Sequence, residues 1–203
     1  MIEVQIKNTS LKFETDSELF SPKAVDIGTL SMLSLTEFLQ GDKVLDLGCG
    51  YGVVGILACK LIGENHVIMS DISDKAVEYA RRNAELNGFS HVDIRLSNGF
   101  ENIMEDDFTL ILSNPPYHTD FSVAKHFIEG AFKKLSVGGR MVMVTKRLEW
   151  YKNKLSSIFG GVKVQEMNGY YVFIAEKRNH CIKNKEKKAT LSRKLQRKQK
   201  RNG

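Results

Sequence analysis

The sequence predicts an α/β fold with a doubly wound, mostly parallel sheet of seven strands. Five short apolar runs alternate with segments of helical periodicity, an order typical of parallel strands joined by helical crossovers. Two further runs flank Asn168-Gly169, a dipeptide typical of tight hairpins, so one antiparallel strand should lie in a C-terminal hairpin. At 203 residues, the chain is long enough for one sizeable core rather than two.

The first elements lie ahead of this series. Residues 2–6 and 11–14 alternate between apolar and polar side chains, so we expect a small N-terminal hairpin. Residues 30–39 have the apolar spacing of a helix, which Gly41-Asp42 should end.

The main sheet follows in chain order. The parallel strands are predicted at 43–47, 66–70, 91–96, 108–112 and 140–145. The helices are predicted at about 53–62, from Ser73 or Asp74 to Asn87-Gly88, at 122–135 with a stop at Val137-Gly138-Gly139, and at about 148–159. The closing hairpin pairs 162–167 with 170–175.

Polar residues and glycines gather where these strands end. In an open α/β sheet, ligands bind outside the carboxyl ends of the strands, near the switch in strand order. The residues at those ends are Asp46, Gly48, Asp71, Ser97 and Asn114, and we expect them to line one crevice.

The loop after the first strand is rich in glycine. Gly50-x-Gly52-x-x-Gly55 has the spacing of a dinucleotide fingerprint, and Asp71 lies where a carboxylate can accept both hydroxyls of a ribose. By this pattern alone, the chain could be a nicotinamide-dependent oxidoreductase, or the loop could serve packing only. Asp46 favours another cofactor, because a carboxylate before the turn can help hold an ammonium group, directly or through water, but would repel a pyrophosphate.

The fourth strand runs into Ser113-Asn114-Pro115-Pro116-Tyr117. Two prolines cannot donate to a strand ladder and have a restricted φ, so the backbone leaving the sheet should be stiff. Asn114 offers an amide oxygen and Tyr117 a flat ring, a combination that can hold a planar amine. Hydride transfer does not need this arrangement, although an ordinary turn could have the same sequence.

Two of these segments resemble motifs of one family. Val44-Leu45-Asp46-Leu47-Gly48-Cys49-Gly50-Tyr51-Gly52 resembles motif I of class I S-adenosylmethionine-dependent methyltransferases, and Asn114-Pro115-Pro116-Tyr117 resembles motif IV of those that methylate exocyclic or amide nitrogens. Phe20-Ser21, Asp26-x-Gly28-Thr29 and the Gly169-Tyr170 hairpin resemble the "small domain" methyltransferases, which include guanine-N2 methyltransferases of small-subunit ribosomal RNA. The resemblance covers about residues 12–176 and implies a Rossmann-like methyltransferase sheet.

The resemblance also implies S-adenosyl-L-methionine as cofactor, and a set of residues that bind it. These are Asp46, Gly48, Gly50, Gly52, Asp71, Ile72, Asn98 and Asn114. The glycines would let the backbone approach the methionine part, Asp71 would bind the ribose hydroxyls, and Ile72 would lie against the adenine. Asn98 stands where many relatives have Asp, and its amide oxygen can still accept a hydrogen bond from the adenine amino group.

The implied catalytic residues are Asn114, Pro115 and Tyr117. An exocyclic amine is a poor nucleophile because its lone pair is delocalised into the ring. Hydrogen bonds to the Asn114 side-chain oxygen and the Pro115 carbonyl would aim the lone pair and stabilise positive charge developing on nitrogen. Tyr117 would stack on a base that has left its helix. Guanine N2 of ribosomal RNA is the favoured target, but adenine N6 of RNA or DNA and glutamine N5 of a protein fit the same motif.

Charge is distributed unevenly along the chain. Residues 177–203 hold twelve of the 30 basic residues and one of the 24 acidic residues, so this tail has a net charge of +11 and residues 1–176 have −5. We therefore expect a methyltransferase domain at 1–176 and a basic tail that contacts RNA phosphates. Lys146 and Arg147, at the end of the fifth strand, are further candidates for phosphate contact. A solubilising terminus, or a cofactor-binding module that chiefly binds RNA, are the alternatives.

The remaining signals concern compartment and metals. Cys49, Cys59 and Cys181 are scattered, which argues against a disulfide framework and against a zinc site. Cys49 lies among glycines, where a small filler is expected more than a nucleophile. The sequence has no apolar run of membrane-spanning length and begins without a basic region followed by an apolar one. We expect a cytoplasmic protein.

Overall fold

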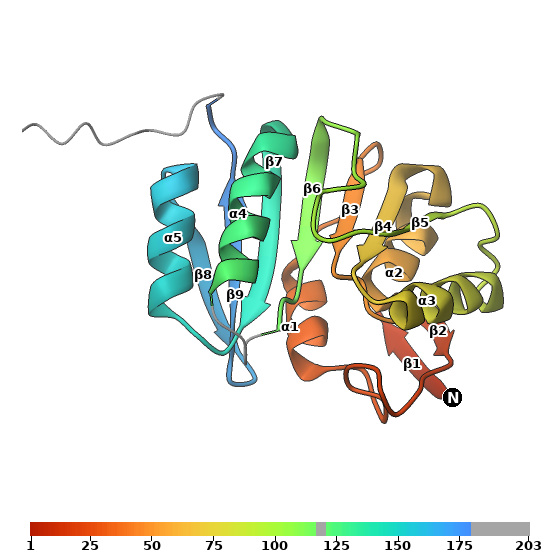
Figure 1. The fold of residues 1–203 in the computed structure, drawn as a ribbon. Coiled ribbons are helices and arrows are strands. Elements are labelled where there is room, and N and C mark those ends of the chain that lie inside the picture. The colour runs from red at the N-terminus through yellow and green to blue at the C-terminus, as the bar shows by residue number, and fades with distance from the viewer. Residues whose placement is uncertain (117–120, 180–203) are drawn as a thin grey trace, which may run out of the picture.

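The computed structural model describes residues 1–116 and 121–179. Its main sheet has seven strands in the order β5-β4-β3-β6-β7-β9-β8 (Figure 1). The strands are β3 (Val44–Leu47), β4 (Val67–Asp71), β5 (Asp93–Leu96), β6 (Phe108–Ser113), β7 (Leu135–Thr145), β8 (Lys163–Met167) and β9 (Tyr170–Glu176). Strand β9 pairs antiparallel with β7 and β8, and the other pairs are parallel. The predicted doubly wound sheet with one antiparallel strand is confirmed.

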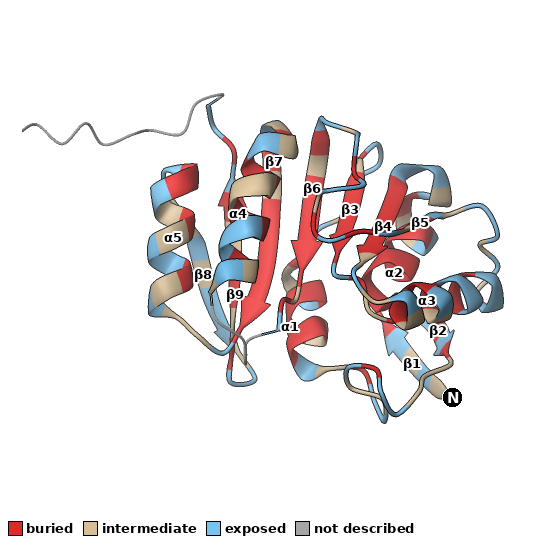
Figure 2. Ribbon diagram, viewed as in Figure 1, coloured by how far each residue is buried: buried red, intermediate tan, exposed pale blue. Residues whose placement is uncertain are grey.

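Helices cover both faces of this sheet. They are α1 (Ile27–Leu35), α2 (Val53–Ile62), α3 (Asp74–Leu86), α4 (Ser122–Lys134) and α5 (Glu149–Phe159), with a short 3₁₀ turn η1 (Glu64–His66) before β4. Val44 belongs to the core cluster that contains buried residues of α1, α2 and α3, whereas its neighbour Leu45 belongs to the cluster that contains those of α4 and α5. Successive strand residues point to opposite faces, and both faces are covered, so nearly all residues of β3 and β6 are buried, as Figure 2 shows.

The predicted N-terminal hairpin is confirmed. Strands β1 (Ile2–Ile6) and β2 (Thr9–Phe13) pair antiparallel outside the main sheet. Their turn is Lys7-Asn8, with φ of 49° and 61° at the two residues, so the second strand begins two residues before the predicted position. A two-residue turn with positive φ at both positions matches the right-handed twist of a hairpin.

One asparagine joins this hairpin to the glycine loop. Asn83 of α3 is fully buried, and its side-chain nitrogen donates to the carbonyl oxygens of Glu14 and Tyr51, at 2.9 Å each. Its side-chain oxygen accepts from the backbone N–H of Glu14 at 2.6 Å. The end of β2 and the loop after β3 are thereby held against the same helix.

Three predicted boundaries are wrong: the start and the end of the first helix, and the separation of α4 from the strand that follows it. The first helix begins at Ile27 rather than at residue 30, because the Asp26 side chain caps its N-terminus by accepting from the Thr29 backbone N–H at 2.8 Å. The helix also ends at Leu35 rather than at residue 39. Residues 137–139 do not separate α4 from a later strand. They belong to β7, which begins at Leu135, directly after the helix.

Hydrogen bonds at the start of β7 explain this extension. Gly138 N–H donates to the Lys177 carbonyl, and Lys177 N–H donates to the Gly139 carbonyl, each at 2.8 Å. Lys177 is buried, and its ammonium group donates to the carbonyl of Leu135. The predicted start of the tail at residue 177 therefore lies within the folded part. The tail from residue 180 onward is outside the described residues.

No helix within 1–116 and 121–179 is both long and apolar enough to cross a bilayer.

Candidate functional site

A cavity of about 390 Å³ opens at the carboxyl ends of the parallel strands. Its walls come from residues 20–29, from the loops after β3, β4, β5 and β6, and from α4. The five residues expected to share a crevice all line it: Asp46, Gly48, Asp71, Ser97 and Asn114. The position that the strand order predicts for a ligand site is thus a real cavity in this sheet.

The loop after β3 forms one wall. Gly48 N–H and Cys49 N–H both donate to the Ser70 carbonyl, at 2.8 and 2.9 Å, which ties this loop to β4. Gly50 has a φ of +55°, and a Cβ added there would meet no atom within 4 Å. The backbone of Gly50 is therefore open to a ligand, as predicted for this position.

Gly52 has a different surrounding from Gly48 and Gly50. It does not line the cavity, although its neighbours in the loop do. A Cβ on Gly52 would lie 2.9 Å from Cδ1 of Ile56 and 3.0 Å from Cε of Met69. Its glycine is explained by packing of α2 against the sheet, which is the alternative left open for this loop.

Asp71 is held at the cavity wall by backbone donors. One carboxylate oxygen accepts from Gly50 N–H at 2.8 Å, and the other accepts from Ser73 N–H at 3.0 Å. Each oxygen keeps a second lone pair, so the carboxylate can still accept hydrogen bonds from two neighbouring hydroxyls.

Asp46 lies deeper, with 2% of its surface exposed, and accepts from Gly55 N–H at 2.8 Å. Burial raises the pKa of the Asp46 carboxyl to about 7, and the negative charge of Asp71 adds to the rise while the Gly55 hydrogen bond opposes it. A cationic ligand in this cavity would favour the ionised carboxylate. The ionisation of Asp46 should therefore depend on whether the cavity holds a cation.

Ile72 and Asn98 stand on the side of the cavity next to β4 and β5. Ile72 is 67% exposed, an apolar surface that a flat ring could cover. Asn98 donates from its side-chain nitrogen to Glu101 at 2.9 Å, so its nitrogen is turned to protein and its amide oxygen is the part left to accept. Both residues line the cavity, and their contacts with an adenine stay a prediction.

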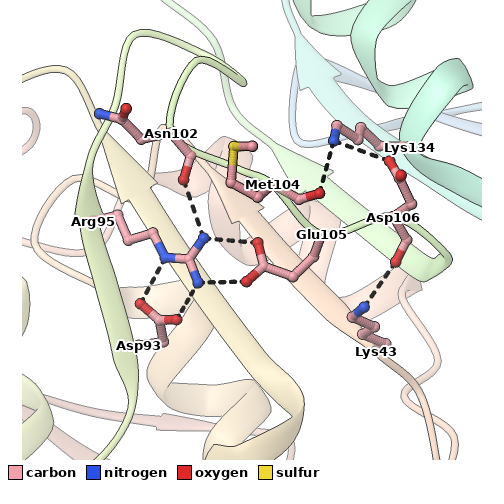
Figure 3. Close-up of polar contacts among 8 residues, drawn as sticks. All are labelled: Lys43, Asp93, Arg95, Asn102, Met104, Glu105, Asp106 and Lys134. Carbon is pink, nitrogen blue, oxygen red and sulfur yellow. Dashed lines mark hydrogen bonds and ion pairs between the residues drawn. The ribbon is translucent and has the colours of Figure 1, made fainter.

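The connection from β5 to β6, which carries Asn98, is anchored by the ion pairs drawn in Figure 3. Arg95 makes a two-pronged contact with Glu105, at 2.6 and 2.7 Å, and a second pair with Asp93. Lys43 donates to the Asp106 carbonyl at 2.7 Å. Hydrogen bonding to Arg95 lowers the pKa of the Glu105 carboxyl to about 2. These contacts tie Glu105 and Asp106, at the far end of the connection, to β5 and to the residue before β3.

Asn114 follows β6, whose last residue, Ser113, donates to the Leu47 carbonyl at 2.8 Å. The Asn114 side-chain nitrogen donates to Oδ2 of Asp26 at 2.9 Å and to Oγ1 of Thr29 at 3.0 Å. An ionised carboxylate accepts and does not donate, so the nitrogen of the amide must be on that side. Among the described residues, no donor contacts the Asn114 amide oxygen.

The neighbours of Asn114 agree in part with the prediction. Pro115 is buried, Pro116 is exposed, and both line the cavity. Tyr117, predicted to stack on the substrate, lies outside the described residues. The contacts of Asp26 and Thr29 with Asn114 were not predicted, because the sequence placed the first helix only from residue 30 and gave these two residues no role beyond the family resemblance. The spacing Asp26-x-x-Thr29 is a helix-capping signal that could have located them.

A second group of side chains lies at the carboxyl end of β7, and we call it the β7 rim: Phe121, Lys146, Arg147 and Trp150. Phe121 stacks on Trp150 with ring centroids 4.3 Å apart. The Arg147 guanidinium carbon lies 4.9 Å from the Phe121 centroid, and the Lys146 ammonium lies 4.9 Å from that of Tyr170. The rim therefore combines positive charge with aromatic surface.

The environment of Cys49 does not favour its use as a nucleophile in this site. Cys49 is buried in the glycine loop, and burial raises the pKa of its thiol well above the ordinary value. Cys59 is also a buried free thiol. Within residues 1–116 and 121–179, no group of three or more His, Cys, Asp or Glu side chains could hold a metal ion.

Comparison with known proteins agrees with this architecture. Residues 10–174 match the family described as "Methyltransferase small domain". The ribosomal RNA small subunit methyltransferase C of Serratia proteamaculans (strain 568) is 33% identical over 165 residues, which cover 79% of this chain and 47% of that protein. The Bacillus subtilis protein YbxB is 31% identical over 179 residues, covering 85% of this chain and 89% of that protein.

The chain is also similar to a methyltransferase named for large-subunit ribosomal RNA and to a solved structure. The ribosomal RNA large subunit methyltransferase G of Pseudoalteromonas translucida is 31% identical over 185 residues, covering 86% of this chain and 48% of that protein. The T. thermophilus 16S rRNA N2 G1207 methyltransferase, solved with AdoMet and guanosine, has a TM-score of 0.80 at 27% identity and covers 87% of this chain and 50% of that chain. This chain spans about half the length of these ribosomal RNA methyltransferases.

The matched region includes the glycine loop, the cavity and the Asn-Pro-Pro segment. The sequence resemblance is confirmed, and an oxidoreductase is excluded as the family. This chain belongs to the methyltransferase small domain family of S-adenosylmethionine-dependent enzymes.

Proposed function

We propose that this protein transfers a methyl group from S-adenosyl-L-methionine to an exocyclic amino group of RNA, with guanine N2 of ribosomal RNA as the favoured target. The observation that carries the proposal is the orientation of the Asn114 side-chain amide. Its nitrogen is bonded to Asp26 and Thr29, which leaves its oxygen to accept a hydrogen bond from an amine in the cavity.

The residues of the cavity fit the proposed cofactor. Asp71 has lone pairs for two ribose hydroxyls, and Ile72 and Asn98 provide an apolar surface and an acceptor for the adenine. Gly48 and Gly50 leave backbone exposed to the methionine part, and Asp46 can balance its positive charge. When bound, the cofactor supplies a methyl group on a sulfonium, which is already a good leaving group.

The protein's task in this reaction is to position the acceptor amine. The Asn114 oxygen and the Pro115 carbonyl would each accept one N–H of the amine, so that its lone pair is directed into the cavity. The same two oxygens stabilise the positive charge that forms on nitrogen during attack. Tyr117 remains a prediction, as a ring that would stack on the extruded base.

RNA as the carrier of this amine is supported by the relatives and by charge. Relatives named for the small and for the large ribosomal subunit both match this chain. The β7 rim lies at the end of the strand that pairs with β6, and its cationic and aromatic side chains would suit a phosphate and a base of nucleotides next to the target. Guanine N2 is favoured because the T. thermophilus neighbour is named for that position and was solved with guanosine.

The test is incubation of the purified protein with labelled S-adenosylmethionine and ribosomal RNA or subunits from cells that lack the gene, followed by nucleoside analysis. We expect label in N2-methylguanosine, from one of the two ribosomal RNAs. Label in N6-methyladenosine, or in glutamine of a ribosomal protein, would replace the proposed target. The Asn114→Ala variant serves as the control for contaminating activity.

A further inference from the structure

We propose that Asp26 is a positioning residue, which orients the Asn114 amide so that its oxygen and not its nitrogen is presented to the substrate amine. The inference deepens the proposed function and depends on it for its kinetic consequence. The contacts of Asp26 with Asn114, Thr29 and Tyr170 carry it, and these residues come from three separate regions of the chain.

The carboxylate of Asp26 accepts hydrogen bonds from several donors. Its Oδ2 accepts from Thr29 N–H at 2.8 Å and from the Asn114 nitrogen at 2.9 Å, with the Thr29 hydroxyl at 3.4 Å. Its Oδ1 accepts from the Tyr170 hydroxyl at 3.3 Å. A backbone N–H can only donate, so residue 26 must present an oxygen at this point. Residue 114 must then present a donor, which Asn does and an ionised Asp cannot.

The orientation of the amide has a direct chemical meaning. In the observed orientation, both hydrogens of the Asn114 nitrogen have acceptors, in Asp26 and in the Thr29 hydroxyl. A rotated amide would bring its oxygen against the carboxylate and would offer N–H groups to an amine, which also donates. It could not accept from the amine or stabilise positive charge on it.

Gly28 lets Asp26 and Tyr170 approach each other closely. A Cβ on Gly28 would lie 2.8 Å from Oδ2 of Asp26 and 2.6 Å from Cε1 of Tyr170. A side chain at residue 28 would therefore separate the carboxylate from the tyrosine. Asp26 also caps α1, so the helix and the Asn114 amide are held by one group.

The variants separate this role from helix capping. Asp26→Ser keeps a capping side chain but is too short to reach Asn114, whereas Asp26→Asn can still present an oxygen to Thr29 and Asn114. Thr29→Val removes the second acceptor with little change in shape, and Thr29→Ser restores a hydroxyl. We expect kcat to fall about 10- to 100-fold in Asp26→Ser and about 3- to 10-fold in Thr29→Val. The conservative variants should stay within about threefold, and KM for RNA and the affinity for S-adenosylhomocysteine should change little. A loss of cofactor affinity with unchanged kcat at saturation would overturn the proposal and assign Asp26 to the cofactor.

A second measurement does not need activity. In the full-length protein, the side-chain NH₂ signals of Asn114, identified by their absence in Asn114→Ala, should exchange with solvent slowly. Asn83, whose NH₂ group is bonded to two carbonyls, is the slow reference, and exposed Asn98, bonded to Glu101, is the fast one. In Asp26→Ser the Asn114 signals should exchange at least about tenfold faster. Exchange of the unsubstituted protein's Asn114 at the Asn98 rate would overturn the proposal, even if the substrate were not RNA.

Discussion

Asp71 and Asn114 stand at the ends of two strands of the same sheet, but they are held by different kinds of contact. Asp71 accepts from the backbone N–H groups of Gly50 and Ser73, which are 21 and 2 residues away in the chain. Asn114 donates to the side chains of Asp26 and Thr29, which are 88 and 85 residues away. The side of the cavity proposed for the cofactor is thus held by backbone donors, and the side proposed for the substrate by side chains from distant segments.

This difference has a consequence for mutation. Backbone donors are present whatever side chain a neighbour carries, so the carboxylate of Asp71 should tolerate substitutions around it. The Asn114 amide depends on particular side chains and should respond to each of them. Binding of cofactor and turnover should therefore be separable by mutation, and the following changes break or sharpen that separation.

The largest effect is expected for Asn114→Ala. Removing the amide oxygen deletes the acceptor that aims the amine, so turnover should fall on the order of 10- to 1,000-fold. Affinity for S-adenosylhomocysteine, measured by calorimetry, should stay within about threefold. Unchanged turnover would remove Asn114 from catalysis.

Asp71→Asn is the complementary change, on the side of the cavity proposed for the cofactor. The amide nitrogen cannot accept from Gly50 or Ser73, and the charge that binds hydroxyls is lost, so cofactor affinity should fall about 10- to 100-fold. At saturating cofactor, turnover should recover to within a few-fold. Asp74→Asn, an exposed carboxylate in the first turn of α3, is the matched control and should bind normally. A defect in Asp71→Asn that saturating cofactor does not correct would mean that the two sides are coupled.

The raised pKa of Asp46 predicts that cofactor binding depends on pH. Its pKa of about 7 in the ligand-free protein should fall when a positive charge binds, so binding releases a proton at lower pH. Affinity for S-adenosylmethionine should rise with pH up to about 7, by at most tenfold per pH unit, and then level off. In Asp46→Asn this part of the dependence should vanish. Calorimetry between pH 5.5 and 8.5 tests the sign, and affinity that falls as pH rises would contradict it.

The same raised pKa affects the ligand-free protein. A carboxyl whose folded pKa exceeds its unfolded value binds its proton more tightly in the folded state, so its contribution to stability is greatest below about pH 4 and is lost as pH rises through about 7. Ionised Asp46 is then a destabilising group in an empty cavity, which a cationic ligand relieves.

The smallest effect is expected for Arg95→Ala. Arg95 and Glu105 are both partly exposed, so loss of their pair should lower the free energy of unfolding by about 1 kcal/mol or less, and cofactor affinity by no more than a few-fold. The pKa of Glu105 is lowered to about 2, so the pair stabilises fully above about pH 4.5 and weakens as pH falls toward 2. Urea unfolding at pH 7 and pH 3 measures this loss of stability. Arg82→Ala, which removes the exposed ion pair of Arg82 with Glu78, is the control. An equal difference from the unsubstituted protein at both pH values would exclude the Glu105 contact as its cause.

The comparison of the two sides also explains which elements were predictable. The parallel strands β3, β4 and β6 were found because each is a short, largely apolar run with buried side chains on both faces. Asp46, Gly48 and Asp71 were placed correctly because strand ends in such a sheet share one edge. Gly52 was assigned to the ligand because its spacing fits the fingerprint, whereas its contacts with Ile56 and Met69 depend on how α2 packs.

Other features depended on contacts between distant segments. Residues 137–139 looked like a helix stop because glycines disfavour regular structure, but pairing with Lys177 extends β7 through them. Asp26 could be seen as part of a family resemblance, yet its contacts with Asn114 and Tyr170 join residues 88 and 144 positions apart.

By itself, then, the sequence determined the order of the strands along the chain, the edge of the sheet where the cavity lies, and the residue types that line it. These follow from periodicity and from glycine, proline and carboxylates at strand ends, which are local properties of the chain. The tertiary structure decided how the side chains are oriented and buried: which atom of Asn114 is bonded to Asp26 and Thr29, and in which direction the pKa of Asp46 is shifted. Such properties arise from burial and from partners far away in the chain, and local pattern contains no information about either.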